Sequence, residues 1–174
     1  MQKTEELKNI LEASSLKSRA ALLKKLETVS KENNCEKLHA PDNALEKEDL
    51  PAIIDFLNKH PSITEVDLND NNLGNEGGVL LFDYMKKNSI IKRLYVKQNK
   101  IGGGAIKELL GLLEENTSLK TLDISHNDLK GYHSSALAEA LAKNTTLEEF
   151  EFDKRGDAET VAAIQAHFSP YKKK

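Results

Sequence analysis

The chain repeats itself every 28 residues, and this period constrains its fold more than any other feature of the sequence. Three segments share one spacing of apolar residues with an asparagine near the end: ITEVDLNDNNL (63–73), IKRLYVKQNKI (91–101) and LKTLDISHNDL (119–129). CEKLHAPDNAL (35–45) follows the same pattern upstream, and LEEFEFDKRGD (147–157) begins in register but has Arg155 in place of the asparagine. An unbroken period of this length indicates a stack of equivalent supersecondary units.

Each unit is predicted to contain a short strand followed by a helix. In the strand, alternate residues such as Leu122 and Ile124 point inward, while the residues between them point out. After the strand, apolar residues recur at helical spacing, and Asn88, Asn116 and Asn144 mark the helix ends. The apolar residues expected on the buried helix faces are Leu50, Ile53, Ile54, Leu57, Leu81, Phe82, Met85, Ile106, Leu109, Leu110, Leu113, Leu137, Ala138 and Leu141.

The repeat resembles the leucine-rich repeat, L-x-x-L-x-L-x-x-N-x-L, in the long helix-containing form of ribonuclease-inhibitor-like proteins. The resemblance covers about residues 35–168. It implies a right-handed α/β solenoid, a horseshoe arc with parallel strands on the concave face and helices on the convex face. In that family the asparagines at the turns, here Asn43, Asn71, Asn99 and Asn127, satisfy backbone groups of neighbouring turns.

We expect a single compact domain with capped ends, because a stack of repeats exposes apolar surface at both ends. Residues 1–34 are predicted to form an N-terminal cap of two amphipathic helices. Residues 35–174 are predicted to form the repeat array, with units starting near 35, 63, 91 and 119 and a degenerate capping unit from 147. The last helix should bury Val161, Ile164 and Phe168.

The composition narrows the classes of partner. The formal net charge of −3 leaves no basic footprint for nucleic acid, and no apolar run is long enough to cross a bilayer. The single cysteine, Cys35, excludes an intramolecular disulfide and a multi-cysteine zinc site, and its inward position predicts a buried thiol. We therefore expect a monomer in a reducing cytoplasm, with no cofactor, metal, nucleic acid or membrane partner.

Two short segments contain the residue types of functional sites. LDISHND (122–128) contains Asp123, Ser125 and His126, as a charge-relay hydrolase does, but the triad needs its histidine between the other two residues. Here Asp123 and Ser125 alternate on one strand and the histidine follows in the turn. The glycine cluster IGGGAIKE (101–108) lacks the Lys-Ser/Thr of a phosphate-binding loop. We interpret it, like LGNEGG (73–78), as a tight turn from strand to helix, and we predict that the protein is not an enzyme.

The concave face is the most informative surface because its side chains have no packing role. The predicted columns across the strands are Lys37, Glu65, Arg93, Thr121 and Glu149; His39, Asp67, Tyr95, Asp123 and Glu151; and Pro41, Asn69, Lys97, Ser125 and Asp153. Two interpretations stay open: cross-strand charge pairs that neutralise one another, or binding hot spots at Tyr95 and Arg93. The residues selected as partner-binding are Arg93, Tyr95, Lys97, Asp67, Asp123 and Glu151.

These features predict a non-catalytic module that binds a protein partner on its concave face. The family resemblance adds three settings. Small stand-alone arrays of this kind occur as effectors that intracellular bacteria deliver into the host cytosol. NTTLEEFEFD (144–153) followed by a terminal helix is similar to the end of tropomodulin-type caps of actin-filament pointed ends. The third setting is a regulator similar to the activator of Ran GTPase, although such arrays are usually much longer.

Overall fold

The computed structural model describes residues 36–129, 134–153 and 158–168, in which strands and helices alternate along the chain. The strands are β1 (Lys37–His39), β2 (Glu65–Asp67), β3 (Arg93–Tyr95), β4 (Thr121–Asp123) and β5 (Glu149–Glu151). The helices are α3 (Leu50–Lys59), α4 (Gly74–Lys87), α5 (Ile106–Glu115), α6 (Ser134–Lys143) and α7 (Ala158–Phe168). Short 3-10 turns, Lys47–Asp49 and Gly103–Ala105, lead into α3 and α5. The predicted N-terminal cap (1–34), Cys35 and Arg155 lie outside the described residues.

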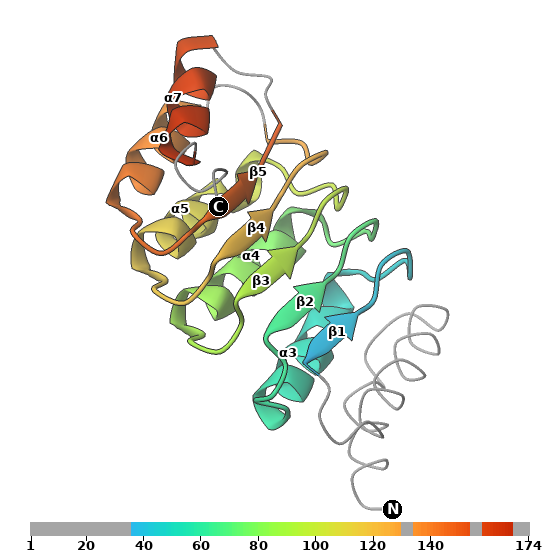
Figure 1. Cartoon of the computed structure of the whole chain (residues 1–174). Helices are drawn as coiled ribbons and strands as arrows, with labels where there is room; N and C mark the ends of the chain where they lie inside the picture. The colour runs from blue at the N-terminus through green and yellow to red at the C-terminus, as the bar shows by residue number, and fades with distance from the viewer. Residues whose placement is uncertain (1–35, 130–133, 154–157, 169–174) are drawn as a thin grey trace, which may run out of the picture.

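The strands form one five-stranded parallel sheet in the order in which they occur along the chain. Every pairing joins residues one repeat apart, as Glu65 pairs with Arg93 and Arg93 with Thr121. The helices lie together on one face of this sheet, and each contacts the next (Figure 1). Packed helices lie about 8–10 Å apart but strands only about 4.8 Å, so the helix layer is the longer, convex side. The architecture is the predicted α/β solenoid.

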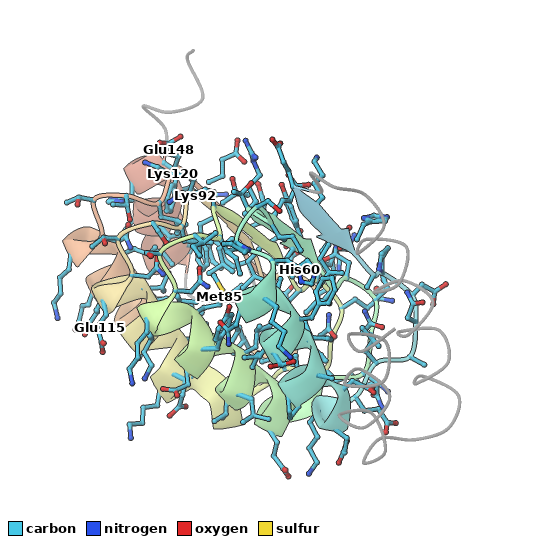
Figure 2. All side chains as sticks on the ribbon, turned by 90° about the horizontal axis from the view of Figure 1, so that it is seen from below. His60, Met85, Lys92, Glu115, Lys120 and Glu148 are labelled. Carbon is cyan, nitrogen blue, oxygen red and sulfur yellow. The ribbon has the colours of Figure 1, made fainter. Side chains whose placement is uncertain are left out.

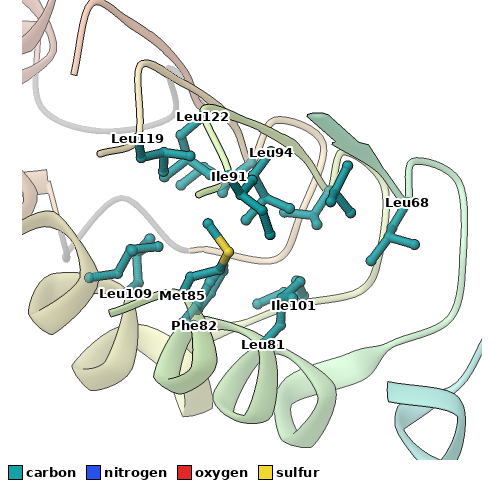
Figure 3. Close-up of a cluster of buried hydrophobic side chains, with 14 of the residues drawn as sticks. Leu68, Leu81, Phe82, Met85, Ile91, Leu94, Ile101, Leu109, Leu119 and Leu122 are labelled. Atoms are coloured by element: carbon teal, nitrogen blue, oxygen red, sulfur yellow. The ribbon is translucent and has the colours of Figure 1, made fainter. Parts of the chain in front are cut away.

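The hydrophobic core fills the space between the sheet and the helices. Val66, Leu94 and Leu122 are the inward residues of β2, β3 and β4, and all three are fully buried. Figure 3 shows the strand-side leucines facing Phe82 and Met85 of α4. The helix residues predicted to be buried are buried, except for four that are only partly so because they lie at the margin of the apolar stripe. These four are Ile54, Ile106, Leu110 and Ala138.

The turn asparagines bind backbone groups of neighbouring repeats, as the family resemblance implies. Asn127 Oδ1 accepts hydrogen bonds from the backbone N–H groups of Asn99 (2.9 Å) and Ile101 (3.0 Å). Its Nδ2 donates to the carbonyl oxygens of Val96, Ile124 and Ser125. Asn71 makes the same set of contacts two repeats earlier. These side chains therefore satisfy buried backbone groups that no strand or helix pairs.

The second turn, which contains Asn71, departs from this pattern, and the effect is seen at Asn99 in the next turn. Asn99 still donates to the carbonyl oxygen of Leu68, but among the described residues its own buried Oδ1 accepts no hydrogen bond. In the first and third turns, the residue after the asparagine, Ala44 or Lys100, has a positive φ. In the second turn the left-handed residue is Gly74 instead (φ +63°), and its N–H donates to the Asn99 carbonyl oxygen. In the shifted second turn, the backbone N–H groups that would donate to Asn99 Oδ1 are therefore no longer in position.

The asparagines at the helix ends form a second ladder, which the sequence marked only as boundaries. Asn116 Oδ1 accepts from the N–H groups of Ser118 (2.8 Å) and Leu119 (2.7 Å). Its Nδ2 donates to the carbonyl oxygens of Met85 and Asn88, in the repeat before. Asn144 repeats this arrangement one unit later. The repeat that starts at 63 is therefore tied to the one that starts at 91, and that one to the next, at both ends of their strands, whereas the Asn88 amide donates to Tyr84 in its own repeat.

Gly78 permits a close approach between consecutive repeats. A Cβ atom at this position would lie 2.8 Å from Ile101 Cγ2 and 2.9 Å from Ala105 Cβ. Real contacts of this kind are essentially never so short, so α4 can lie against the turn before α5 only because the residue is glycine. The predicted tight turn is confirmed at Gly74, where the backbone conformation itself favours glycine.

Candidate functional site

The concave face consists of the strand residues that point away from the helices. The strand register places them in the two predicted strand columns, Lys37–Glu65–Arg93–Thr121–Glu149 and His39–Asp67–Tyr95–Asp123–Glu151. All ten side chains are exposed or half-buried, whereas the strand residue between each pair is buried. The described helices all lie on the other side of the sheet, so none of them covers this face (Figure 1).

On β1 to β3, acidic side chains are paired with cationic or potentially cationic ones. Glu65 accepts a hydrogen bond from Lys37 Nζ (3.0 Å), and its other oxygen lies 3.5 Å from Arg93 Nη1. Asp67 Oδ2 lies 2.8 Å from His39 Nδ1. The charge-pairing interpretation therefore describes this half of the face, including Asp67 and Arg93 from the predicted site. The Arg93 side chain is still 51% exposed.

On β4 and β5, the acidic side chains are bonded to hydroxyl groups instead. Ser125 donates both its hydroxyl (2.6 Å) and its backbone N–H (2.9 Å) to Asp123 Oδ1. Thr121 Oγ1 donates to Glu149 Oε2 (3.1 Å), and Glu151 is exposed, with no bonded partner among the described residues. In the part of the chain that the structure describes, no cationic side chain pairs with any of these carboxylates.

Tyr95 lies at the border between the two halves. Its ring is half-buried, between Asp67 and Asp123 in the strand register. Burial, with a smaller contribution from the Glu65 carboxylate, raises the pKa of the Tyr95 phenol above its ordinary value. The hydroxyl therefore stays protonated at neutral pH. Lys97, two positions past the strand, makes no ion pair with its side chain among the described residues.

The residues of LDISHND do not form a charge relay. The Ser125 hydroxyl donates directly to Asp123, and the histidine does not lie between them. His126 is exposed in a left-handed turn (φ +55°), and its backbone N–H donates to Asp153 Oδ1 (3.1 Å). The predicted arrangement, with Asp123 and Ser125 at alternate positions and His126 in the turn after them, is therefore confirmed. Within the described ranges, no three His, Cys, Asp or Glu side chains gather into a group that could hold a metal ion.

A shallow hollow of about 450 Å³ lies beside the concave face, at the carboxyl ends of β2 to β4. Sequence reasoning missed it, because it forms where successive turns with positive φ values stack. Its lining residues are Asp70, Asn71, Gln98, Lys100, His126, Asn127 and Asp128. The charges in this lining are mixed, and no side chain in it is both buried and unbonded, so the hollow suggests no particular ligand.

Most charged side chains on the helical face are neutralised locally. Lys143 on α6 pairs with Glu114 on α5 (2.8 Å), and Lys59 pairs with Asp55 within α3 (2.9 Å). Lys92, Lys120 and Glu148 stand in a row at the amino ends of β3 to β5 (Figure 2), where Lys120 and Glu148 pair at 2.9 Å. Exposed pairs of this kind add little stability. None of the described helices is long and apolar enough to cross a bilayer.

A sequence model named "Leucine Rich repeat" matches residues 59–82 and 115–131. The solved structure of leiomodin-1 actin-binding site 2 is similar to the whole array, with a TM-score of 0.74 at 18% identity over 92% of this chain and 91% of that one. The chain has a leucine-rich repeat fold. Another structure with this fold, the tropomodulin C-terminal domain of Caenorhabditis elegans, matches with a TM-score of 0.68 at 12% identity over 89% of this chain and 93% of that chain. No curated protein matches the sequence.

Proposed function

We propose that the protein is a non-catalytic module that binds a protein partner on its concave face. The observation that carries the proposal is the middle strand, which presents Arg93 and Tyr95 on a sheet face that no described helix covers. Arginine and tyrosine are enriched among interface hot spots, and a shallow sheet suits a macromolecule better than a small ligand. The proposal assumes a reducing cytoplasm. A setting as a bacterial effector in a host cytosol stays a prediction.

The test is affinity capture from lysate with the native protein and a Tyr95→Ala, Arg93→Glu double variant. We expect the captured protein to bind the variant at least about tenfold more weakly, because both hot-spot side chains are lost. Circular dichroism checks that the variant folds. A Leu80→Ala, Lys87→Glu variant is the matched control, because both residues are exposed on α4 of the helical face. A partner that binds the Tyr95→Ala, Arg93→Glu variant but not the control variant would show that the helices bind it.

Actin is the second candidate partner. The likeness to a solved actin-binding site, which extends over nearly the full length of both chains, favours it. If actin is the partner, the protein should sediment with actin filaments or slow elongation at pointed ends when barbed ends are blocked. The Tyr95→Ala, Arg93→Glu variant should lose this effect if the concave face is the binding surface. Absence of both effects at actin concentrations that saturate a leiomodin-1 control would exclude actin.

A further inference from the structure

We propose, on the basis of the protein-binding function proposed above, that the acidic half of the concave face binds a basic segment of the partner protein. The acidic half is defined as Asp123, Glu149 and Glu151 on β4 and β5, with Tyr95 at its border. Lysine or arginine side chains of the partner would lie over these carboxylates. The inference adds the chemistry of the partner to the proposed surface.

The first argument is the contrast between the two halves of one sheet. Glu65 on β2 contacts Lys37 and Arg93, so this half already contains the cations that its carboxylates attract. The carboxylates of the acidic half lie in the same two columns, but Asp123 and Glu149 are bonded to hydroxyl and N–H groups, and Glu151 has no bonded partner among the described residues. A hydroxyl orients a carboxylate without neutralising it. The acidic half therefore presents negative charge that nothing in the described chain compensates.

The second argument is a like-charged pair in the sheet. Asp123 and Glu151 are direct partners in the register of β4 and β5, about 4.8 Å apart. Like charges directly opposite one another destabilise a sheet. A cation bound between them removes this repulsion and adds charge-assisted hydrogen bonds. The free energy that the sheet loses in isolation is thus recovered when a basic side chain binds.

The third argument is that two of the three carboxylates, those of Asp123 and Glu149, are held in place before any partner binds. Ser125 contributes two hydrogen bonds to Asp123 Oδ1, and Oδ2 has no bonded partner within the described ranges. Thr121 contributes one hydrogen bond, from its hydroxyl, to Glu149 Oε2. Carboxylates that are already oriented lose less side-chain entropy when they bind a cation. Their fixed positions favour arginine, whose planar guanidinium donates several hydrogen bonds in a rigid fork.

Tyr95 extends this surface with an aromatic ring. It is the register partner of Asp123, and a guanidinium over its face would gain a cation–π interaction while reaching the carboxylate. Arg93 does not compete for this place, because its guanidinium lies near Glu65. Lys97, in the turn after β3, has no ion pair among the described residues, and its charge opposes a basic partner. Removing that charge should therefore strengthen binding.

The experiment uses the full chain and a fluorescent peptide of alternating arginine and glycine, with a glutamate–glycine peptide as the negative probe. Fluorescence anisotropy gives the affinity from about 0.05 M to about 0.5 M salt. The test variant, Asp123→Asn, Glu149→Gln, Glu151→Gln, removes the acidic half. The control variant makes the same change in net charge on α5 and α6: Glu108→Gln, Glu115→Gln, Glu139→Gln. NMR of the native chain locates the residues whose amide signals shift.

We expect the arginine peptide to bind the native protein and the control alike, and the test variant about tenfold more weakly. Lys97→Gln should bind about twofold more tightly, and shifted amides should cluster on β3 to β5. Equal weakening by both triple variants would show attraction to net charge alone and overturn the proposal. So would failure to bind the arginine peptide at low salt. The proposal would also be overturned if the native protein formed a dimer that did not bind the peptide and the test variant were monomeric. In that case the face would bind a second copy of the chain.

The outcome is separable from that of the proposed function. If the protein captured from lysate is lost with Tyr95→Ala, Arg93→Glu but kept with the triple-neutralised acidic half, protein binding on the concave face stands and the basic-segment chemistry is wrong. If both variants keep the captured protein, the proposed binding face is itself wrong.

Discussion

Asn127→Ala is expected to lower the free energy of unfolding by about 3–5 kcal/mol. The side chain is only 3% exposed and bonds backbone groups on both sides of a repeat boundary. Without it, the N–H groups of Asn99 and Ile101 lose their acceptor, in a place where a fully buried polar group costs about 1–3 kcal/mol if unpaired. Urea unfolding followed by circular dichroism measures the change.

The same substitution along the ladder should give a graded series. Asn99→Ala should cost less than Asn127→Ala, because Asn99 Oδ1 accepts no hydrogen bond. Asn43→Ala should cost least, since Asn43 is only half-buried and its side-chain amide bonds the carbonyl oxygen of Pro41 in its own turn. Equal losses at all three positions would contradict the role assigned to the bonds between repeats.

The solenoid and its strand columns were predictable because a repeat makes equivalent residues neighbours in space. Once the period is 28 residues, Tyr95 has to lie between Asp67 and Asp123, whatever the side chains do. The buried helix positions follow from the apolar spacing for the same reason. The regular spacing of the repeats therefore accounts for the features of the site that depend only on the backbone, such as the order of residues in each column.

The pairing of charges on that face was not predictable. In its column Arg93 has a neighbour on each side, Glu65 and Thr121. Only the conformations of the long side chains decide that the guanidinium lies near Glu65. The hydroxyl bonds to Asp123 and Glu149 are equally local, since the side-chain rotamers of Ser125 and Thr121 decide them. The division of the face into a paired half and an acidic half arises from these choices.

The shifted second turn was also beyond the sequence. Glycine occupies the equivalent position in two successive repeats, Gly74 and Gly102, yet only Gly74 has a positive φ. Gly102 instead allows Asn75 Oδ1 to accept its N–H at close range. The same residue type thus serves backbone conformation in one repeat and close packing in the next, which the period by itself does not distinguish.

Phe82→Ala is expected to destabilise the fold by about 3–5 kcal/mol, as large truncations in a packed core do. Phe82 is fully buried on α4, where it faces the inward residues of the sheet (Figure 3). The cost combines the lost burial with the cavity that remains, since the turns on both sides are held by the asparagine ladders and limit collapse. Urea unfolding again measures it, with Phe82→Leu expected to lose less because it leaves a smaller cavity.

Leu80→Ala on the same helix is the matched control for this truncation. Leu80 is 43% exposed, and its loss should change the free energy of unfolding by less than about 1 kcal/mol. Helix propensity favours alanine over both parent residues, so it does not explain a loss at Phe82. Similar small losses for the two variants would mean that the core between α4 and the sheet is loosely packed. In that case the strands would lack the rigid support that a preorganised concave face requires.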